Sequence, residues 1–260
     1  AMTVYWTGID RYSGAYGTIH GLAHSMFMFL FFAIMLFVIN KSVSNVYIKV
    51  SFFFLLVISL FNLTKTYTRN VLIGFYMFIS LVLVGHKKYK TLILITLSLL
   101  IFSLFSETVQ QTFYDFVDVY EGEREIDTLG TGRIGIWKEF IESYNEQEIA
   151  NKIIGVGITR LGATHNDILG LFYNSGIAGL CLYILFVITV YYDILNNSLK
   201  KNIKFLFIGF LSATLFMNLA SNSYISRVEL AQLWYFVLGI FYAMKDMTEE
   251  NISEKTFEVL

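Results

Sequence analysis

The 260-residue sequence contains little charge for its length. Only 15% of its residues are Asp, Glu, Lys or Arg, whereas 56% are hydrophobic, and the mean hydropathy is +0.60. Soluble domains carry about 25% charged residues, and so little polar sequence cannot cover the apolar segments of a soluble protein. We therefore predict an integral membrane protein.

Cysteine and proline are also scarce. The single cysteine, Cys181, lies inside an apolar run, so the chain contains neither a disulfide framework nor a cysteine metal cluster. Proline is absent, although average usage of about 5% would give roughly a dozen, and this bias of composition has no evident physical cause. The net charge of −1 argues against a nucleic-acid partner. The polar, glycine-rich opening does not have the pattern of a cleavable signal peptide, so none is predicted.

Long apolar runs predict an all-α membrane protein, a multi-pass bundle in which residues 1–260 form one membrane domain. About seven runs are candidate spans: residues 21–39, 46–61, 71–85, 91–106, 168–192, 204–220 and 230–244. Several are shorter than the ~20 residues that cross the hydrocarbon core, so their polar flanks must contribute. Asn174–Gly176 interrupts the fifth run, which predicts a short re-entrant piece followed by the true span.

Lysine-rich connections predict the orientation of the bundle. Residues 86–90 (HKKYK) join the third and fourth runs, and three lysines at 200, 201 and 204 join the fifth and sixth. Both connections are predicted to be cytoplasmic, together with the tail at about 245–260. Alternation then places outside the N-terminal segment and the connections at 62–70, 107–165 and 221–229.

All six arginines fall on the predicted outer side, whereas the basic residues on the cytoplasmic side are lysines. The arginines are Arg11, Arg69, Arg124, Arg133, Arg160 and Arg227. Orientation does not distinguish the two residue types, but phosphate recognition favours the planar guanidinium with its several donors. Arg124 stands among glutamates and is interpreted as their ion-pair partner. Arg69 is interpreted as functional, because a charge at a helix end near membrane depth is costly without a cavity or partner.

The outer connection at 107–165 holds 11 acidic and five basic residues. Two sets of apolar residues follow a helical period: Val109, Phe113, Phe116, Val117 and Tyr120, and then Ile134, Trp137, Ile141 and Tyr144 with Ile136 and Phe140 beside them. They predict two amphipathic helices, either at the outer membrane–water boundary or packed on each other over the mouth of the bundle. The acidic residues lack the spacing of a calcium loop, so no metal site is predicted.

The end of this connection, just before the fifth run, carries the sequence Thr164-His165-Asn166-Asp167. Thr164 and Asp167 fit a capping box, which would explain the stretch structurally. A helix start also gathers free N–H groups that bind phosphate, and Arg160 lies five residues before His165. Gly155-Val-Gly157, slightly upstream, is too short a motif to predict a nucleotide site.

The other three histidines have structural explanations. His20 and His24 lie near the start of the first run and are interpreted as boundary or packing residues, and His86 stands among cytoplasmic lysines. His165 is therefore the histidine for which a function is predicted.

Three motifs together resemble the shared domain of bacterial O-antigen ligases and O-antigen or capsular polysaccharide polymerases. The first motif combines Gly132-Arg133, Trp137, Gly155-x-Gly157 and His165-Asn166, followed by an apolar helix. The second is Arg11-Tyr12-Ser13-Gly14, and the third is Leu63-Thr64-Lys65-Thr66 leading to Arg69. The resemblance spans roughly residues 10–245. Family members usually have more helices upstream, so the chain is similar to their C-terminal part. It departs from the family at Ile19-His20, where an Asn is common.

The resemblance implies a GT-C-like fold and glycosyl transfer outside the bacterial cytoplasmic (inner) membrane. The donor would be an oligosaccharide on a polyprenyl pyrophosphate, and the acceptor a sugar hydroxyl of a second glycan, as in the polymerisation of O-antigen or capsule repeat units. The pyrophosphate needs positive charge, which arginines supply without a metal or other cofactor, and the hydroxyl needs a base near neutral pH. His165 is the predicted base; the predicted pyrophosphate ligands are Arg69, Arg160 and Arg227, and the predicted sugar contacts are Arg133 and Arg11.

Two alternatives remain open from the sequence. A ligase would transfer a finished glycan to a lipid or protein acceptor, and it needs the same residues. A transporter or flippase usually keeps ionisable groups near the bilayer midplane, whereas the predicted midplane stretches here are nearly uncharged. Membrane lipid and other polysaccharide assembly proteins are the further expected partners.

Overall fold

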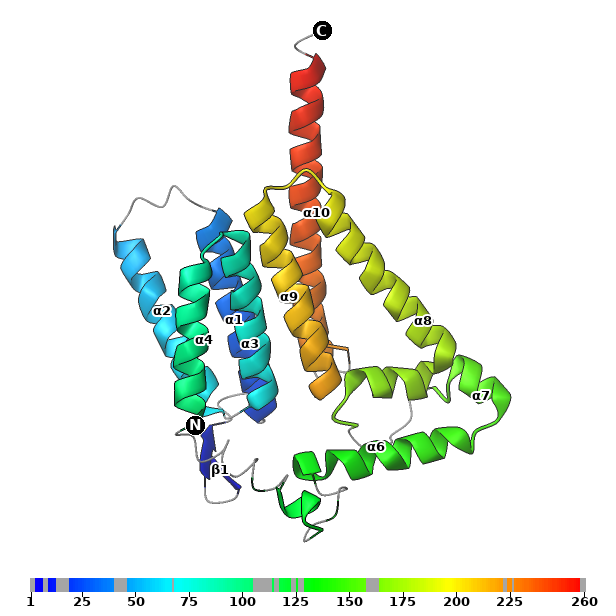
Figure 1. The fold of residues 1–260 in the computed structure, drawn as a ribbon. Helices are drawn as coiled ribbons and strands as arrows, with labels where there is room; N and C mark the ends of the chain where they lie inside the picture. The colour runs from blue at the N-terminus through cyan, green and yellow to red at the C-terminus, as the bar shows by residue number, and fades with distance from the viewer. Residues whose placement is uncertain are drawn as a thin grey trace. The chain divides into compact units, whose positions relative to one another are not determined.

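The chain is almost entirely helical in the computed structural model (Figure 1). The structure describes residues 3–6, 9–12, 19–39, 46–66, 68–104, 114, 117–122, 125, 129–157, 164–221, 224–225 and 227–257. The elements are β1 (Thr3–Trp6), β2 (Ile9–Tyr12), α1 (Ile19–Ile39), α2 (Val46–Lys65), α3 (Arg69–Gly85), α4 (Tyr89–Leu104), α6 (Leu129–Asn145), α7 (Ile149–Ile154), α8 (Asp167–Asn196), α9 (Lys201–Ala220) and α10 (Val228–Phe257).

Each of the seven predicted apolar runs forms a helix, which confirms the helical class. Within the part of the chain that the structure describes, three helical segments are long and apolar enough to cross a membrane: Gly21–Val38, Asp167–Asn196 and Lys201–Ala220. Shorter apolar stretches occur in α2, α3 and α4. The sequence did not predict the antiparallel hairpin of β1 and β2, in which Arg11 pairs with Val4. Of the predicted helix over 109–120, residues 117–120 are helical, whereas Val109, Phe113 and Phe116 lie outside the described residues.

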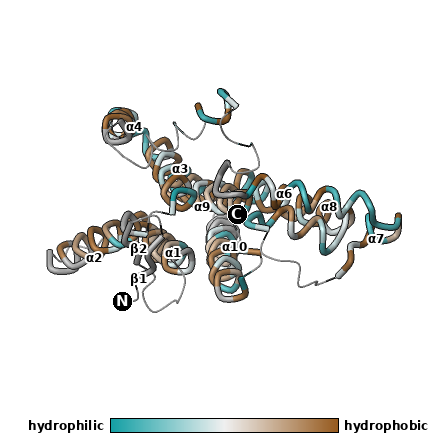
Figure 2. Tube along the Cα trace, turned by 90° about the horizontal axis from the view of Figure 1, so that it is seen from below, coloured by the Kyte–Doolittle hydropathy of each residue, from teal (hydrophilic) through white to brown (hydrophobic). Residues whose placement is uncertain are grey.

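The chain divides into two compact units. The first comprises Ala1–His86, Val190–Asn218 and Ser223–Leu260, and the second comprises Lys87–Thr189 and Leu219–Asn222. Hydrophobic residues predominate in the apolar helices α1 to α4, whereas α6 carries more hydrophilic residues (Figure 2). The predicted single membrane domain stays a prediction.

The first unit is held together by an aromatic core between α1, α3 and α9. Phe31 of α1 is fully buried, and its ring centroid lies 4.4 Å from that of Phe210 and 5.6 Å from that of Phe78. Small residues allow the helices to approach closely: Gly209 of α9 lies against Phe78, and Gly74 of α3 lies against Met217. This packing holds α3, whose first residue is Arg69, against α1 and α9.

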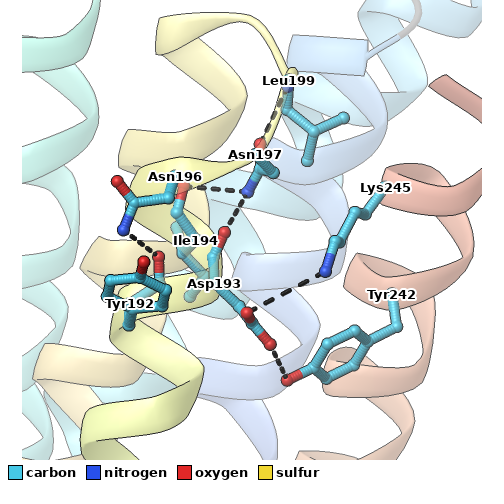
Figure 3. A network of polar contacts seen from close by, with 8 residues as sticks. All are labelled: Tyr192, Asp193, Ile194, Asn196, Asn197, Leu199, Tyr242 and Lys245. Atoms are coloured by element: carbon cyan, nitrogen blue, oxygen red, sulfur yellow. Dashed lines mark hydrogen bonds and ion pairs between the residues drawn. The ribbon is translucent and has the colours of Figure 1, made fainter. Parts of the chain in front are cut away.

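A polar network joins the end of α8 to α10 in the same unit (Figure 3). The hydroxyl of Tyr242 donates to the Asp193 carboxylate at 2.9 Å, and the ammonium of Lys245 lies 3.9 Å from it. Lys204 donates to the carbonyl of Leu195 at 2.8 Å, where a cation stabilises the C-terminus of a helix. Lys204, which the sequence analysis used only for orientation, therefore also caps α8.

Candidate active site

The helix that follows His165 is broken near its start. Gly176 in α8 has φ 64° and ψ −168°, values outside the helical region. The carbonyl of Asn174 accepts a hydrogen bond from the Gly157 amide at 3.0 Å, and that of Tyr173 accepts one from Val156 at 3.5 Å. In a chain without proline, glycine supplies the kink, and the upstream loop satisfies the carbonyls beside it. The break predicted at Asn174–Gly176 is present; the re-entrant path of the first piece stays a prediction.

Two glycines make this contact possible. Gly155 and Gly176 both have positive φ and are buried. A Cβ at Gly155 would collide with the carbonyl of Asn174, and one at Gly176 would collide with the carbonyl of Ile153. The Gly155-Val-Gly157 motif therefore has a structural role: it lets the chain leaving α7 lie against the kink of α8.

Helix α6 packs on the first piece of α8 through aromatic side chains. The Phe140 ring meets Tyr173 edge-on at 5.2 Å, and Tyr144 lies 4.4 Å from Phe172. The hydroxyls of Ser143 and Tyr173 are 2.9 Å apart. Ile141, which the sequence placed on the same apolar face as Tyr144, is 52% exposed, so the contacts of α6 with α8 are made by its aromatic side chains.

The start of α8 is capped by a different residue from the predicted one. Asn166 precedes the helix, and its side-chain oxygen accepts a hydrogen bond from the Leu169 amide at 3.0 Å, which is the geometry of an N-cap. The Thr164 hydroxyl donates to the carbonyl of Asn166 at 2.7 Å and accepts from the Asn166 amide at 3.3 Å. The predicted capping box of Thr164 and Asp167 was therefore wrong: Thr164 forms the turn before the cap.

His165 stands between these two residues in a left-handed conformation. Its φ is 49°, and its side chain is half-buried. Non-glycine residues adopt this conformation uncommonly, and such residues cluster at functional sites, where the surrounding structure holds them in place. Trp137 of α6 contributes to this support, because its indole N–H donates to the carbonyl of Thr164 at 2.9 Å.

Arg133 is anchored in the same unit. Its Nη1 donates to the carbonyl of Ala220, the last residue of α9, at 2.8 Å. A cation there complements the helix dipole, and a guanidinium carries five N–H donors, so this bond is compatible with the predicted sugar contact. Arg133 precedes Trp137 by four residues, on the same face of α6. One helix face therefore carries both Arg133 and the indole that bonds to the residue before His165.

The first unit carries two other predicted residues at helix starts. Arg69 is the exposed first residue of α3. Arg227 precedes α10, and its carbonyl accepts hydrogen bonds from Leu230 at 3.1 Å and Ala231 at 2.8 Å. The helix dipole disfavours a cation at an N-terminus. A guanidinium next to the N–H groups of a helix start, however, combines two kinds of anion-binding donor.

The loop before Arg227 is fixed by a buried pair that the sequence missed. Nδ1 of His24 in α1 lies 3.4 Å from the hydroxyl of Tyr224, and the Tyr224 amide donates to Asn218 at 3.0 Å. Burial raises the pKa of Tyr224 well above its ordinary value of 10, so the phenol stays neutral at physiological pH. The interpretation of His24 as a packing residue agrees with its complete burial. Its partner is 200 residues away, and sequence spacing gives no signal for such a pair.

The remaining predicted residues are only partly described. Arg11 lies on β2, and nothing about its side chain is described; Arg160 lies outside the described residues. Of the others, His165 and Arg133 belong to the second unit, and Arg69 and Arg227 to the first. The described part of the chain contains no group of three or more His, Cys, Asp or Glu side chains that could hold a metal ion.

Comparison with known proteins gives no relative: no protein-family model, curated protein or solved structure matches the chain. The resemblance to O-antigen ligases and polymerases therefore rests on the sequence motifs alone. The function has to be argued from the chemistry of the described residues.

Proposed function

We propose that the protein transfers an oligosaccharide from a polyprenyl pyrophosphate to a sugar hydroxyl of an acceptor glycan. The observation that carries the proposal is His165, a half-buried imidazole held in a left-handed turn directly before the Asn166 cap of α8. An imidazole titrates near neutral pH and is a natural base for a hydroxyl. A capped helix start needs no histidine, and non-glycine residues at positive φ cluster at functional sites, which supports a function for this side chain.

In the proposed reaction, His165 takes the proton of the acceptor hydroxyl as its oxygen attacks the anomeric carbon of the donor. The new glycosidic bond forms while the bond from that carbon to the pyrophosphate oxygen breaks. Negative charge develops on the leaving pyrophosphate, where Arg69, Arg160 and Arg227 would stabilise it. Arg133 and Arg11 would contact sugar hydroxyls. The arginines supply the positive charge, so the reaction is proposed to need neither a metal nor another cofactor.

The proposal places the reaction on the outer face of the bacterial inner membrane. All seven apolar helices would span the bilayer in a GT-C-like arrangement, with the connection at 107–165 outside. Support comes from the three helical segments with the length and apolarity of spans and from the lysine-rich inner connections. The polyprenyl chain would lie along the phenylalanine- and leucine-rich helices.

Extension of a glycan repeat is the favoured form of the reaction, and ligation of a finished glycan is the second candidate. A strain lacking a polymerase accumulates single repeat units on the lipid, whereas a strain lacking a ligase accumulates long unligated chains. Analysis of the lipid-linked glycans in a deletion strain therefore separates the two.

The proposal is tested with the purified full-length chain in vesicles containing polyprenyl-pyrophosphate-linked repeat units. We expect longer lipid-linked glycans and released polyprenyl pyrophosphate, with equal yield when EDTA is present. Movement of intact donor across the bilayer without any new glycosidic bond would contradict the proposal and support a flippase. Complete inhibition by EDTA would contradict the metal-independent mechanism.

A further inference from the structure

Helix α7 has the reverse of the pattern expected for a helix facing water. Its four exposed residues are all apolar: Ile149, Ala150, Ile153 and Ile154. The three isoleucines are 76%, 50% and 68% exposed, respectively. Its two polar residues, Asn151 and Lys152, are the half-buried ones. In soluble proteins lysine is among the most exposed residues and isoleucine among the most buried.

Lys152 is turned away from the apolar face. Its ammonium donates to the carbonyl of Asn145 at 2.8 Å and lies 6.0 Å from the centre of the Tyr144 ring. Both partners belong to α6, so the only charge of α7 is directed toward the protein. The exposed face is thus left without a charged group, as expected for a surface in contact with lipid.

The apolar face adjoins a side of α8 that exposes apolar residues. The carbonyl of Ile153 lies so close to Gly176 that a Cβ there would collide with it, and Ile177, the next residue, is 49% exposed. Further along α8 the large exposed side chains are again apolar, including Leu182, Leu185 and Ile188. The helix has the length and hydropathy of a membrane span. Exposed apolar side chains therefore occur both on α7 and on the part of α8 that follows the kink beside it.

We propose that α7 lies in the membrane surface, with Ile149, Ile153 and Ile154 inserted among the outermost parts of the lipid acyl chains. The Gly155–Gly157 loop bonds to the carbonyls of Tyr173 and Asn174 at the kink of α8, so α7 would enter the bilayer surface beside this break in the helix. The inference depends on the membrane character of α8 and not on glycosyl transfer. The alternatives are that another protein or a second copy of the chain covers this face. A label on the face would then be shielded from both oxygen and water-soluble reagents, and the test separates these cases from insertion into lipid.

The test is spin-label accessibility in the full-length protein, reconstituted in vesicles of phosphatidylethanolamine and phosphatidylglycerol. The label is attached at Ile153→Cys or Ile149→Cys, in a Cys181→Ser background because Cys181 is exposed. Glu142→Cys, exposed on the neighbouring α6, is the matched control. Collision rates are measured with oxygen, which concentrates in hydrocarbon, and with a water-soluble nickel chelate.

At positions 149 and 153 we expect a collision rate with oxygen several-fold above that with nickel, and at position 142 the reverse. If the label at position 153 collides with the nickel chelate as often as the label at position 142 does, the inference is overturned, because the helix would then lie in water. Low collision rates with both reagents would also overturn it and would indicate a covering protein surface or second copy. Circular dichroism and elution as one species establish that each variant is folded. Two label positions are used so that the measurement can still be made if one labelled variant does not fold.

Discussion

Gly155 and Gly176 determine the path of the backbone around the candidate active site, since each occupies space that a side chain would need. Both have positive φ, and each meets a carbonyl of the other's segment. The loop that ends α7 is thereby held against α8 by backbone contacts.

Gly155→Ala should destabilise the protein more than Gly157→Ala. Both glycines have positive φ, 83° and 79°, which costs alanine about 1–2 kcal/mol, and the ψ of 173° at Gly155 lies in a region that is essentially restricted to glycine. At Gly155 the new methyl group would also meet the Asn174 carbonyl, whereas at Gly157 nothing lies within 4 Å. The apparent Tm in detergent should fall by roughly 2–8 °C for Gly157→Ala and further for Gly155→Ala. Equal losses would show that the loop does not lie against the kink.

Sequence reasoning located the kink but could not find its partner or the right cap. Asn174-Ser175-Gly176 is visible as a polar interruption of an apolar run, whereas the loop that satisfies its carbonyls lies 17 or more residues upstream. The stretch Thr164-His165-Asn166-Asp167 offers three possible cap residues. Only the backbone conformation, with His165 left-handed, decides that Asn166 is the cap.

Arg69→Lys should abolish most glycan assembly while the protein still inserts into the membrane. Lysine keeps the positive charge, but it loses the planar fork that binds two phosphate oxygens at once. Arg69 is exposed at the start of α3, so the change should leave the apparent Tm nearly unchanged. The measurement is the length distribution of glycans in cells, with Lys90→Arg as a control on the predicted cytoplasmic side. Near-normal product from Arg69→Lys would reduce Arg69 to a membrane anchor.

At the scale of elements, most long helices were predictable and the short elements were not; α10 is the exception among the long ones, because it continues to Phe257 through the predicted tail at about 245–260. Runs of 15 or more apolar residues are visible without knowledge of their partners, and α1, α8 and α9 begin and end within four residues of the predicted runs. The six residues of α7 are too few to show a helical period. The hairpin of β1 and β2 lies in the polar opening, where no alternating pattern predicts it.

The bond between α6 and the His165 turn should matter for catalysis more than for stability. Trp137→Phe removes the indole N–H that reaches Thr164, and Trp234→Phe removes an equivalent bond to the Thr214 hydroxyl in the first unit. Each loss should cost about 0.5–1.5 kcal/mol of stability. We expect only Trp137→Phe to lower turnover, by roughly tenfold or less, with donor affinity unchanged. Equal turnover in the two variants would show that Trp137 does not position the turn.

At the scale of the whole molecule, the account depends on which side of the membrane each connection faces. Glu121 and Lys88 are exposed in the connections predicted to lie outside and inside, respectively. In a Cys181→Ser background, Glu121→Cys should react with an impermeant thiol reagent in intact cells, and Lys88→Cys should react only after the cells are opened. The opposite labelling would place His165 in the cytoplasm and would exclude an outer active site.

The central claim is that His165 is the base of an outward-facing glycosyl transfer, and His165→Asn separates this role from that of a turn residue. Asparagine tolerates the left-handed conformation that His165 adopts, so the turn and the Asn166 cap should persist. Its amide cannot accept the proton of the acceptor hydroxyl. Alanine is a poorer choice, because it would add strain at positive φ.

The most direct measurement is the single-turnover rate of sugar transfer from bound polyprenyl-pyrophosphate-linked donor by the purified His165→Asn protein, with donor binding measured separately. The account predicts a rate lower by about 10²–10⁴-fold, the usual loss on removal of a general base, with donor affinity unchanged. A rate within a few-fold of the unaltered protein would contradict the account, because His165 would then serve only to shape the turn before α8.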